Sequence, residues 1–123
     1  MATIKSYTDL EQSKKLAEIL ALESADMHYS KHSLENYYSP IPLIGKYSNI
    51  QNEIPCWSLA ALIDIIESIE QKVTVSFTHC NDKFWVDVHF SEFGSFCQDY
   101  ELYDSKIDSL IAIIEKLKSR NLL

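Results

Sequence analysis

The most regular pattern in the chain is an alternation of apolar and polar residues on either side of the dipeptide Asn81-Asp82. Every second residue is apolar over about 73–79 and again over about 84–90, as expected for strands with one buried face. Asn and Asp are typical of the tight turn that joins two antiparallel strands, so the pattern predicts a β-hairpin. The predicted cross-strand pairs are Cys80 with Lys83, Phe77 with Val86, and Val75 with Val88.

Three further segments have apolar residues at the spacing of amphipathic helices. These predicted helices cover residues of about 9–22, 58–69 and 105–119. Thr8 and Glu11 fit a capping box at the start of the first helix. Ser58 is the expected N-cap of the second helix, and either Asp104 or Ser105 caps the third.

The rest of the chain adds one strand and one long connection. A third strand is predicted over about 96–103, close to the hairpin in sequence. Residues from about 26 to 53 are polar and rich in tyrosine, and two prolines and a glycine interrupt them. We expect an irregular connection there, with short strands at its ends. Together these elements predict a single α+β domain in which a small antiparallel meander packs against two or three helices.

Composition and charge exclude several functions. The chain has 123 residues and two glycines, too few and too far apart for a Gly-rich phosphate-binding loop. A net charge of −7 disfavours direct binding to nucleic acid. Residues 82–108 hold seven acids and two bases, which suits either a surface for a basic partner or a solubilising surface.

The sequence has the features of a cytoplasmic protein. Its first eight residues are polar, so we expect no signal peptide, and no apolar run is long enough for a membrane span. Three cysteines without close spacing indicate neither a disulfide framework nor a Cys-x-x-Cys site. His79 and His89 fall on opposite faces of the predicted hairpin and cannot share one ion, so we expect no metal and no cofactor.

One catalytic arrangement is an alternative to a binding function. Cys56 lies just before the second predicted helix, where N–H groups and the helix dipole lower the pKa of a thiol. Asp87 and His89 lie on the polar side of a later strand. Papain-like hydrolases have this order of cysteine and histidine, but their Cys-Gly-x-Cys-Trp sequence is absent here. The competing interpretation is that Cys56 is a buried core residue.

Three stretches of the chain resemble a family of small uncharacterised proteins of gut Bacteroidales, which often lie among prophage or mobile-element genes. The stretches are Glu23-Ser24-Ala25-Asp26-Met27, Ile54-Pro55-Cys56-Trp57-Ser58-Leu59-Ala60-Ala61-Leu62, and Tyr103-Asp104 with Asp108, Ile114, Lys116 and Leu117. The resemblance implies a bacterial cytoplasm and a mobile element as context. It brings no catalytic residue with it.

The absence of catalytic motifs favours a non-enzymatic protein that binds a protein partner, and we expect neither a membrane nor a nucleic acid as partner. Tyrosines in the long connection suit a contact surface, and they equally suit the completion of a small core. A homodimer through a sheet edge or through the tyrosine-rich connection stays open. The candidate contact residues are Tyr29, Tyr37, Tyr38, Tyr47, Trp85, Asp87, Asp99 and Glu101.

Overall fold

A computed structural model of the chain describes residues 6–30, 41–42, 53–91, 94–97 and 102–123. In this part of the chain, helices and antiparallel strands form an α+β fold, as the sequence predicts. The chain divides into two compact units, Ser6–Ala61 and Leu62–Leu123, the second of which also includes Met1–Lys5. We call them the N-terminal and C-terminal units and describe each by itself. None of the helices in the described ranges has the length and apolarity of a membrane span.

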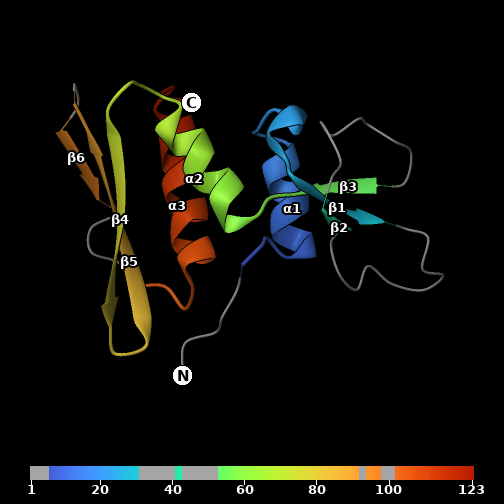
Figure 1. The fold of residues 1–123 in the computed structure, drawn as a ribbon, viewed down its shortest axis with the longest axis horizontal. Coiled ribbons are helices and arrows are strands. Elements are labelled where there is room, and N and C mark those ends of the chain that lie inside the picture. Colours follow the sequence, from blue (N-terminus) through green and yellow to red (C-terminus); the bar gives the residue numbers. More distant parts are fainter. Residues whose placement is uncertain (1–5, 31–40, 43–52, 92–93, 98–101) are drawn as a thin grey trace. The chain divides into compact units, whose positions relative to one another are not determined.

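The N-terminal unit holds one helix, one 3-10 turn and a small antiparallel sheet (Figure 1). Its elements are α1 (Leu10–Ala17), η1 (Leu22–Ser24), β1 (Met27–Ser30), β2 (Ile41–Pro42) and β3 (Glu53–Cys56). The strand order is β2-β1-β3, and Met27 pairs with both Pro42 and Cys56. Strands β1 and β3 stand at the two ends of the predicted long connection and pair with each other, which satisfies main-chain groups at both ends.

Helix α1 begins one residue later than the sequence pattern predicts. Its N-cap is Asp9, whose carboxylate accepts a hydrogen bond from the Gln12 N–H at 2.8 Å. The Gln12 side chain in turn accepts one from the Asp9 N–H at 3.1 Å, which completes a capping box. The predicted box of Thr8 and Glu11 is therefore wrong by one position, because the Thr8 side chain is buried in other hydrogen bonds. The helix ends at Ala17, before the predicted limit.

The C-terminal unit is built around the predicted hairpin. Helix α2 (Leu59–Glu67) leads into this unit, and its other elements are β4 (Val73–Cys80), β5 (Lys83–Phe90), β6 (Gly94–Cys97) and α3 (Lys106–Ser119). The order of the sheet is β4-β5-β6, all antiparallel. Each predicted cross-strand pair of the hairpin is confirmed. Asn81 and Asp82 have φ values of 48° and 63°, as the central residues of a type I′ turn require.

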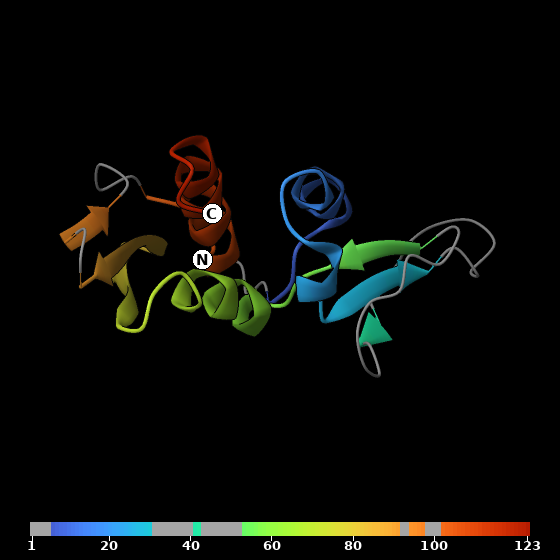
Figure 2. The same ribbon diagram turned by 90° about the horizontal axis from the view of Figure 1, so that it is seen from above.

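One face of this sheet is packed against α3, which lies along β5 (Figures 1 and 2). Val86 and Val88 on β5 are at most 1% exposed, and Ile114 on α3 is fully buried. Burying such a side chain contributes roughly 1.5–3 kcal/mol before the loss of conformational entropy is counted. Helix α3 starts after Ser105, the N-cap, whose hydroxyl accepts a hydrogen bond from the Asp108 N–H at 3.1 Å. Of the two predicted caps, Ser105 is confirmed.

The third strand differs from its predicted range. Strand β6 covers Gly94–Cys97, and Tyr103 forms a separate bridge to Phe84 with hydrogen bonds of 2.8 and 2.7 Å. Asp87 pairs with Cys97, and Phe84 pairs with Tyr103. The two paired positions are three residues apart on β5 but six residues apart on the other segment. The two pairings therefore cannot belong to one regular strand over 96–103, because a regular ladder matches residues one for one.

Candidate functional site

The hairpin carries the first candidate site on the face that lies opposite α3. We call this the polar face; its residues on β4 and β5 are Thr74, Ser76, Thr78, Trp85, Asp87 and His89. The three β4 residues and His89 are exposed, whereas Trp85 and Asp87 are half-buried. Both residues come from β5, the central strand, and Asp87 pairs with Ser76 on one side and with Cys97 on the other.

Asp87 is the most unusual residue of the polar face. It faces Ser76 across the hairpin, and the Ser76 hydroxyl donates to the Asp87 main-chain oxygen at 3.4 Å. One carboxylate oxygen of Asp87, Oδ1, is buried and has no hydrogen-bond partner. A buried acceptor without a donor costs roughly 1–3 kcal/mol. A bound partner that supplies an N–H group at this position would recover that cost.

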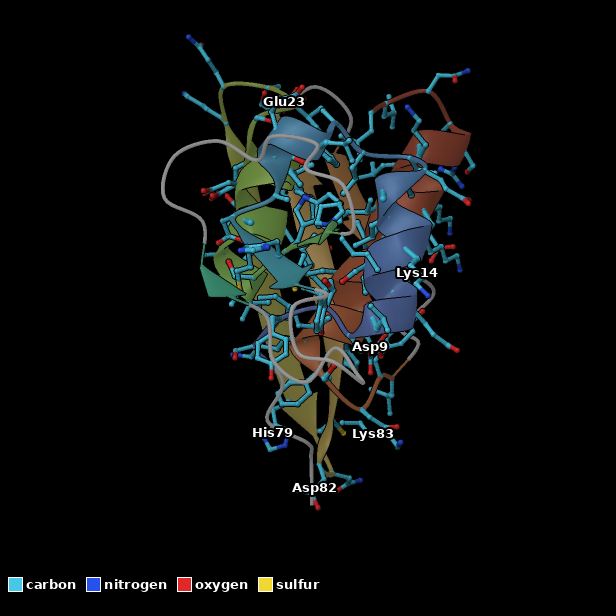
Figure 3. The ribbon with its side chains drawn as sticks, turned by 90° about the vertical axis from the view of Figure 1, so that its right-hand side faces the viewer. Asp9, Lys14, Glu23, His79, Asp82 and Lys83 are labelled. Carbon is cyan, nitrogen blue, oxygen red and sulfur yellow. The ribbon has the colours of Figure 1, made fainter. Side chains whose placement is uncertain are left out.

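The charges around the hairpin are partly balanced within the chain. Lys83 at the start of β5 forms an ion pair with Asp104 at 2.5 Å between Nζ and Oδ1 (Figure 3 shows Lys83 at the hairpin tip). The pair is exposed and contributes little to stability. The Lys106 ammonium lies 5.1 Å from the ring centre of Phe77 and 5.8 Å from that of Phe84. Thus both bases of residues 82–108 have identified contacts, and neither contact is with Asp87.

The second candidate site is a buried set of hydroxyl and thiol groups in the N-terminal unit. We call it the Thr8 cluster; its residues are Thr8, Ser13, Tyr29 and Cys56. The Thr8 hydroxyl is 2.7 Å from Ser13 Oγ and 3.4 Å from Cys56 Sγ, and it accepts from the Trp57 N–H at 3.2 Å. The Thr8 carbonyl accepts a hydrogen bond of 2.7 Å from the Tyr29 hydroxyl. These contacts hold the segment before α1 against the junction of β3 and α2.

Cys56 does not have the environment of an activated nucleophile. Its side chain is fully buried, and burial raises the pKa of the thiol, although hydrogen bonds with Thr8 and Ser13 act in the opposite direction. The expectation that a helix N-terminus lowers this pKa is therefore wrong. Two residues separate Cys56 from the first residue of α2, and its thiol contacts Thr8 instead. A buried thiol with a raised pKa is chemically inert at neutral pH.

The other two residues of the hydrolase alternative lie elsewhere in the chain. Cys56 belongs to the N-terminal unit, and Asp87 and His89 belong to the C-terminal unit. Both share the polar face, as the alternation predicts, because Asp87 pairs with Ser76 and His89 with Thr74. The hydrolase thus stays an alternative hypothesis against which the burial of Cys56 weighs.

The remaining predicted contact residues divide between one buried residue and five outside the described range. Tyr29 is 4% exposed, and burial is the largest cause that raises the pKa of its hydroxyl. Of the two interpretations of this tyrosine, its buried hydrogen bond to Thr8 fits a core residue. The predicted contact residues that lie outside the described range are Tyr37, Tyr38, Tyr47, Asp99 and Glu101.

Two stretches of the chain, residues 23–27 and 54–62, are joined by hydrogen bonds. Asp26 accepts from the Ser58 N–H at 2.8 Å and from the Ser58 hydroxyl at 2.5 Å. The indole N–H of Trp57 donates to Ser24 Oγ at 2.9 Å. Ser58 also caps α2, as predicted, because its Oγ accepts from the Ala61 N–H at 3.1 Å. The residue types of these stretches therefore have a structural explanation in the N-terminal unit.

No metal centre can be assembled from the described residues, since no three His, Cys, Asp or Glu side chains among them are grouped as ligands. The His79 ring stacks on Phe84 with 4.9 Å between ring centres, on the face that carries α3. His89 lies on the polar face, so the predicted separation of the two histidines is confirmed. Of the described cysteines, Cys56 and Cys80 are both free thiols.

Compared with protein-family models, with curated proteins and with solved structures, the chain matches none. These comparisons therefore add nothing to the functional argument. Sequence reasoning did not single out Ser13, whose partner Thr8 is only five residues away but was interpreted as a helix cap. It also missed the contact between Asp26 and Ser58, because these residues are 32 positions apart. The sequence did hold a signal for the contact between Asp26 and Ser58. Asp26 is an acid at the start of the predicted long connection, and Ser58 is the predicted N-cap of a helix.

Proposed function

We propose that the protein is a small, non-enzymatic accessory protein that binds a basic protein partner through its polar face. The observation that carries the proposal is the buried, unpartnered Oδ1 of Asp87 beside the half-buried Trp85. A Lys or Arg side chain of the partner would donate to this carboxylate, and its aliphatic part would pack on the indole ring.

The overall charge of the protein supports the same kind of partner. With a net charge of −7, the protein attracts basic surfaces at long range and repels nucleic acid. Tryptophan is among the residue types that contribute most at protein interfaces, because a large ring buries much area with few rotatable bonds. Asp99 and Glu101 are included in the proposed surface on the basis of their sequence positions.

The proposed setting follows from the family resemblance. We place the protein in the cytoplasm of a gut Bacteroidales bacterium, where a mobile element would encode it. Its free and buried Cys56 thiol suits a reducing compartment.

Affinity capture with matched variants tests the proposal. The immobilised wild-type chain, Trp85→Ala and Asp87→Lys would be exposed to lysate of a gut Bacteroidales bacterium, and retained proteins identified by mass spectrometry. Glu11→Lys is the control, since Glu11 is an exposed acid on α1 and its replacement changes the net charge equally. We expect a basic protein whose retention falls about tenfold or more in both polar-face variants and stays unchanged in the control.

Two results would contradict the proposal. In one, all four chains retain the same proteins in the same amounts although circular dichroism shows each variant to be folded. In the other, proteins are lost in Asp87→Lys and Glu11→Lys alike, which would indicate unspecific attraction by net charge. Raising the salt from about 0.1 M to about 1 M should release a charge-dependent partner, because the screening length falls from about 10 Å to about 3 Å.

A further inference from the structure

Among the residues that the structure describes, the outer side of β4 is an open sheet edge. In the described residues the order of the sheet is β4-β5-β6, so β5 pairs with one side of β4 and no strand pairs with the other. The second side of β5, in contrast, pairs with β6 and with Tyr103. A sheet edge of this kind offers a row of main-chain donors and acceptors to a further strand.

The hairpin turn determines which residues point their main-chain groups outwards. A two-residue type I′ turn closes on a hydrogen-bonded pair, here Cys80 and Lys83. Hydrogen-bonded and non-hydrogen-bonded pairs alternate along an antiparallel ladder. The even-numbered residues of β4 therefore bond to β5. The residues whose N–H and C=O groups point to the open edge are Val73, Val75, Phe77 and His79.

Strand β4 lacks the usual protection of an edge strand. Its eight residues include no proline and no Asp, Glu, Lys or Arg, the residues that commonly block edge pairing. Its apolar side chains are also incompletely covered. Val75 and Phe77 are half-buried, whereas Val86 and Val88, which face them on β5, are at most 1% exposed. A strand added at the edge would cover both the main chain and these side chains.

We propose that β4 pairs antiparallel with β4 of a second copy of this chain, with Ser76 opposite Ser76 at the two-fold axis. In this register Val75 faces Phe77 of the other copy, and Val73 faces His79. Four outward amide groups from each copy then form about eight main-chain hydrogen bonds. Moving the register so that Phe77 faces itself would place Val73 against the turn residue Asn81 and lose about two of these bonds.

The charges at the two ends of β4 fit the same pairing. Lys72 precedes the strand and Asp82 follows it, and both side chains are exposed. In the proposed register Lys72 lies opposite Cys80 of the other copy and diagonal to Asp82, a spacing of about 7–8 Å that a lysine side chain can reach. The two-fold axis repeats this contact. The middle of the proposed interface contains no Asp or Glu, so the two negatively charged copies do not bring acidic side chains together there.

In the proposed register the sheets of the two copies join into one continuous sheet. Odd-numbered residues of β4 face odd-numbered residues of the other copy, and even-numbered residues face even-numbered ones. Residues that face each other in the proposed register have the same parity, so the helix-covered faces of the two copies lie on the same side. The polar faces then join into one surface. The dimer does not depend on the proposed partner of the polar face, and each proposal can fail alone.

Light scattering with charge variants tests the dimer. As its concentration rises from about 1 μM to about 1 mM, the wild-type chain should reach the mass of a dimer. This range covers dissociation constants from micromolar to millimolar. Ser76→Lys and Ser76→Glu each place two like charges face to face, so each variant alone should be monomeric. An equimolar mixture of the two should form dimers again. His89→Lys is the control, because His89 is an exposed residue of the same face on the central strand.

A cysteine at the axis tests the register. In the Cys80→Ser background, Ser76→Cys should form an intermolecular disulfide under mild oxidation, since a non-hydrogen-bonded pair has Cα atoms about 4.5 Å apart, within disulfide range. Thr78→Cys in the same background should not, because it would face Thr74. A wild-type chain that is monomeric throughout the concentration range overturns the proposal. So do dimers of Ser76→Lys or Ser76→Glu alone, or equal cross-linking of both cysteine variants.

Discussion

The carboxylate of Asp26 accepts two hydrogen bonds from Ser58, a residue 32 positions later in the chain. One comes from the main-chain N–H at 2.8 Å and the other from the hydroxyl at 2.5 Å. The Ser58 oxygen in turn accepts from the Ala61 N–H, so a residue between η1 and β1 fixes the start of α2. A negative charge at this place also interacts favourably with the helix dipole.

Replacing Asp26 should therefore destabilise the protein. We expect Asp26→Ala to lower the free energy of unfolding by about 1–3 kcal/mol, because two donors on Ser58 lose a charged acceptor. Chemical denaturation followed by circular dichroism measures this change. Asp64→Ala, which removes an exposed carboxylate from α2, serves as the control and should change it by less than about 0.5 kcal/mol. Equal effects of the two substitutions would show that the Asp26 contact adds nothing.

Cys56 and Cys80 should react at very different rates. Cys80 is exposed at the end of β4, whereas Cys56 is fully buried and has a raised pKa. With iodoacetamide at neutral pH, we expect rapid labelling of Cys80 and labelling of Cys56 only after denaturant is added. Peptide mass spectrometry assigns the label to each site. Rapid labelling of Cys56 in the folded protein would support the hydrolase alternative instead.

The buried thiol and phenol should make the protein less stable in alkali. Burial raises the pKa of Cys56 and of Tyr29, so the folded state retains protons that the unfolded state loses. Stability is therefore unaffected below the unfolded pKa and falls as the pH rises above about 8.5 for the thiol and about 10 for the phenol. Each group contributes a slope of at most about 1.4 kcal/mol per pH unit.

Substitution separates the two groups. The difference in unfolding free energy between the wild-type chain and Cys56→Ala should narrow between about pH 8.5 and pH 10, while that between the wild-type chain and Tyr29→Phe should stay constant there. Denaturation at a series of pH values measures both differences. A constant difference for Cys56→Ala across this window would mean that the thiol keeps its ordinary pKa on folding.

Lys106 should stabilise the C-terminal unit through cation–π contacts with Phe77 and Phe84. Its ammonium group lies 5.1 Å from the centre of Phe77 and 5.8 Å from that of Phe84. Lys106→Gln should lower the free energy of unfolding by about 0.5–1 kcal/mol, and Lys106→Arg should retain most of it. Lys118→Gln, on an exposed turn of α3, is the matched control. If Lys106→Gln lowers the free energy of unfolding no more than Lys118→Gln does, the cation–π contact does not stabilise the protein.

The C-terminal unit was largely predictable because its signals are local. The alternation around Asn81-Asp82 determined both the pairing of the hairpin and the face on which His89 lies. The Thr8 cluster was not predictable in this way. Thr8 read as a helix cap from its neighbours, but Cys56, its partner, is 48 residues away and outside any local pattern. The unpartnered oxygen of Asp87 also depends on its neighbours in space, because alternation gives the side of a strand and not the donors around it.

The distance in sequence between Thr8 and its partners has a consequence for biosynthesis. Thr8 and Ser13 leave the ribosome 48 and 43 residues before Cys56. At about 5–20 residues per second, roughly 2–10 s pass between the synthesis of Thr8 and Ser13 and the synthesis of Cys56. The paired residues of the hairpin, by contrast, are made within roughly 1–3 s of each other at the most. The residues of the Thr8 cluster therefore stay without their partners for longer after synthesis than the paired residues of the hairpin do.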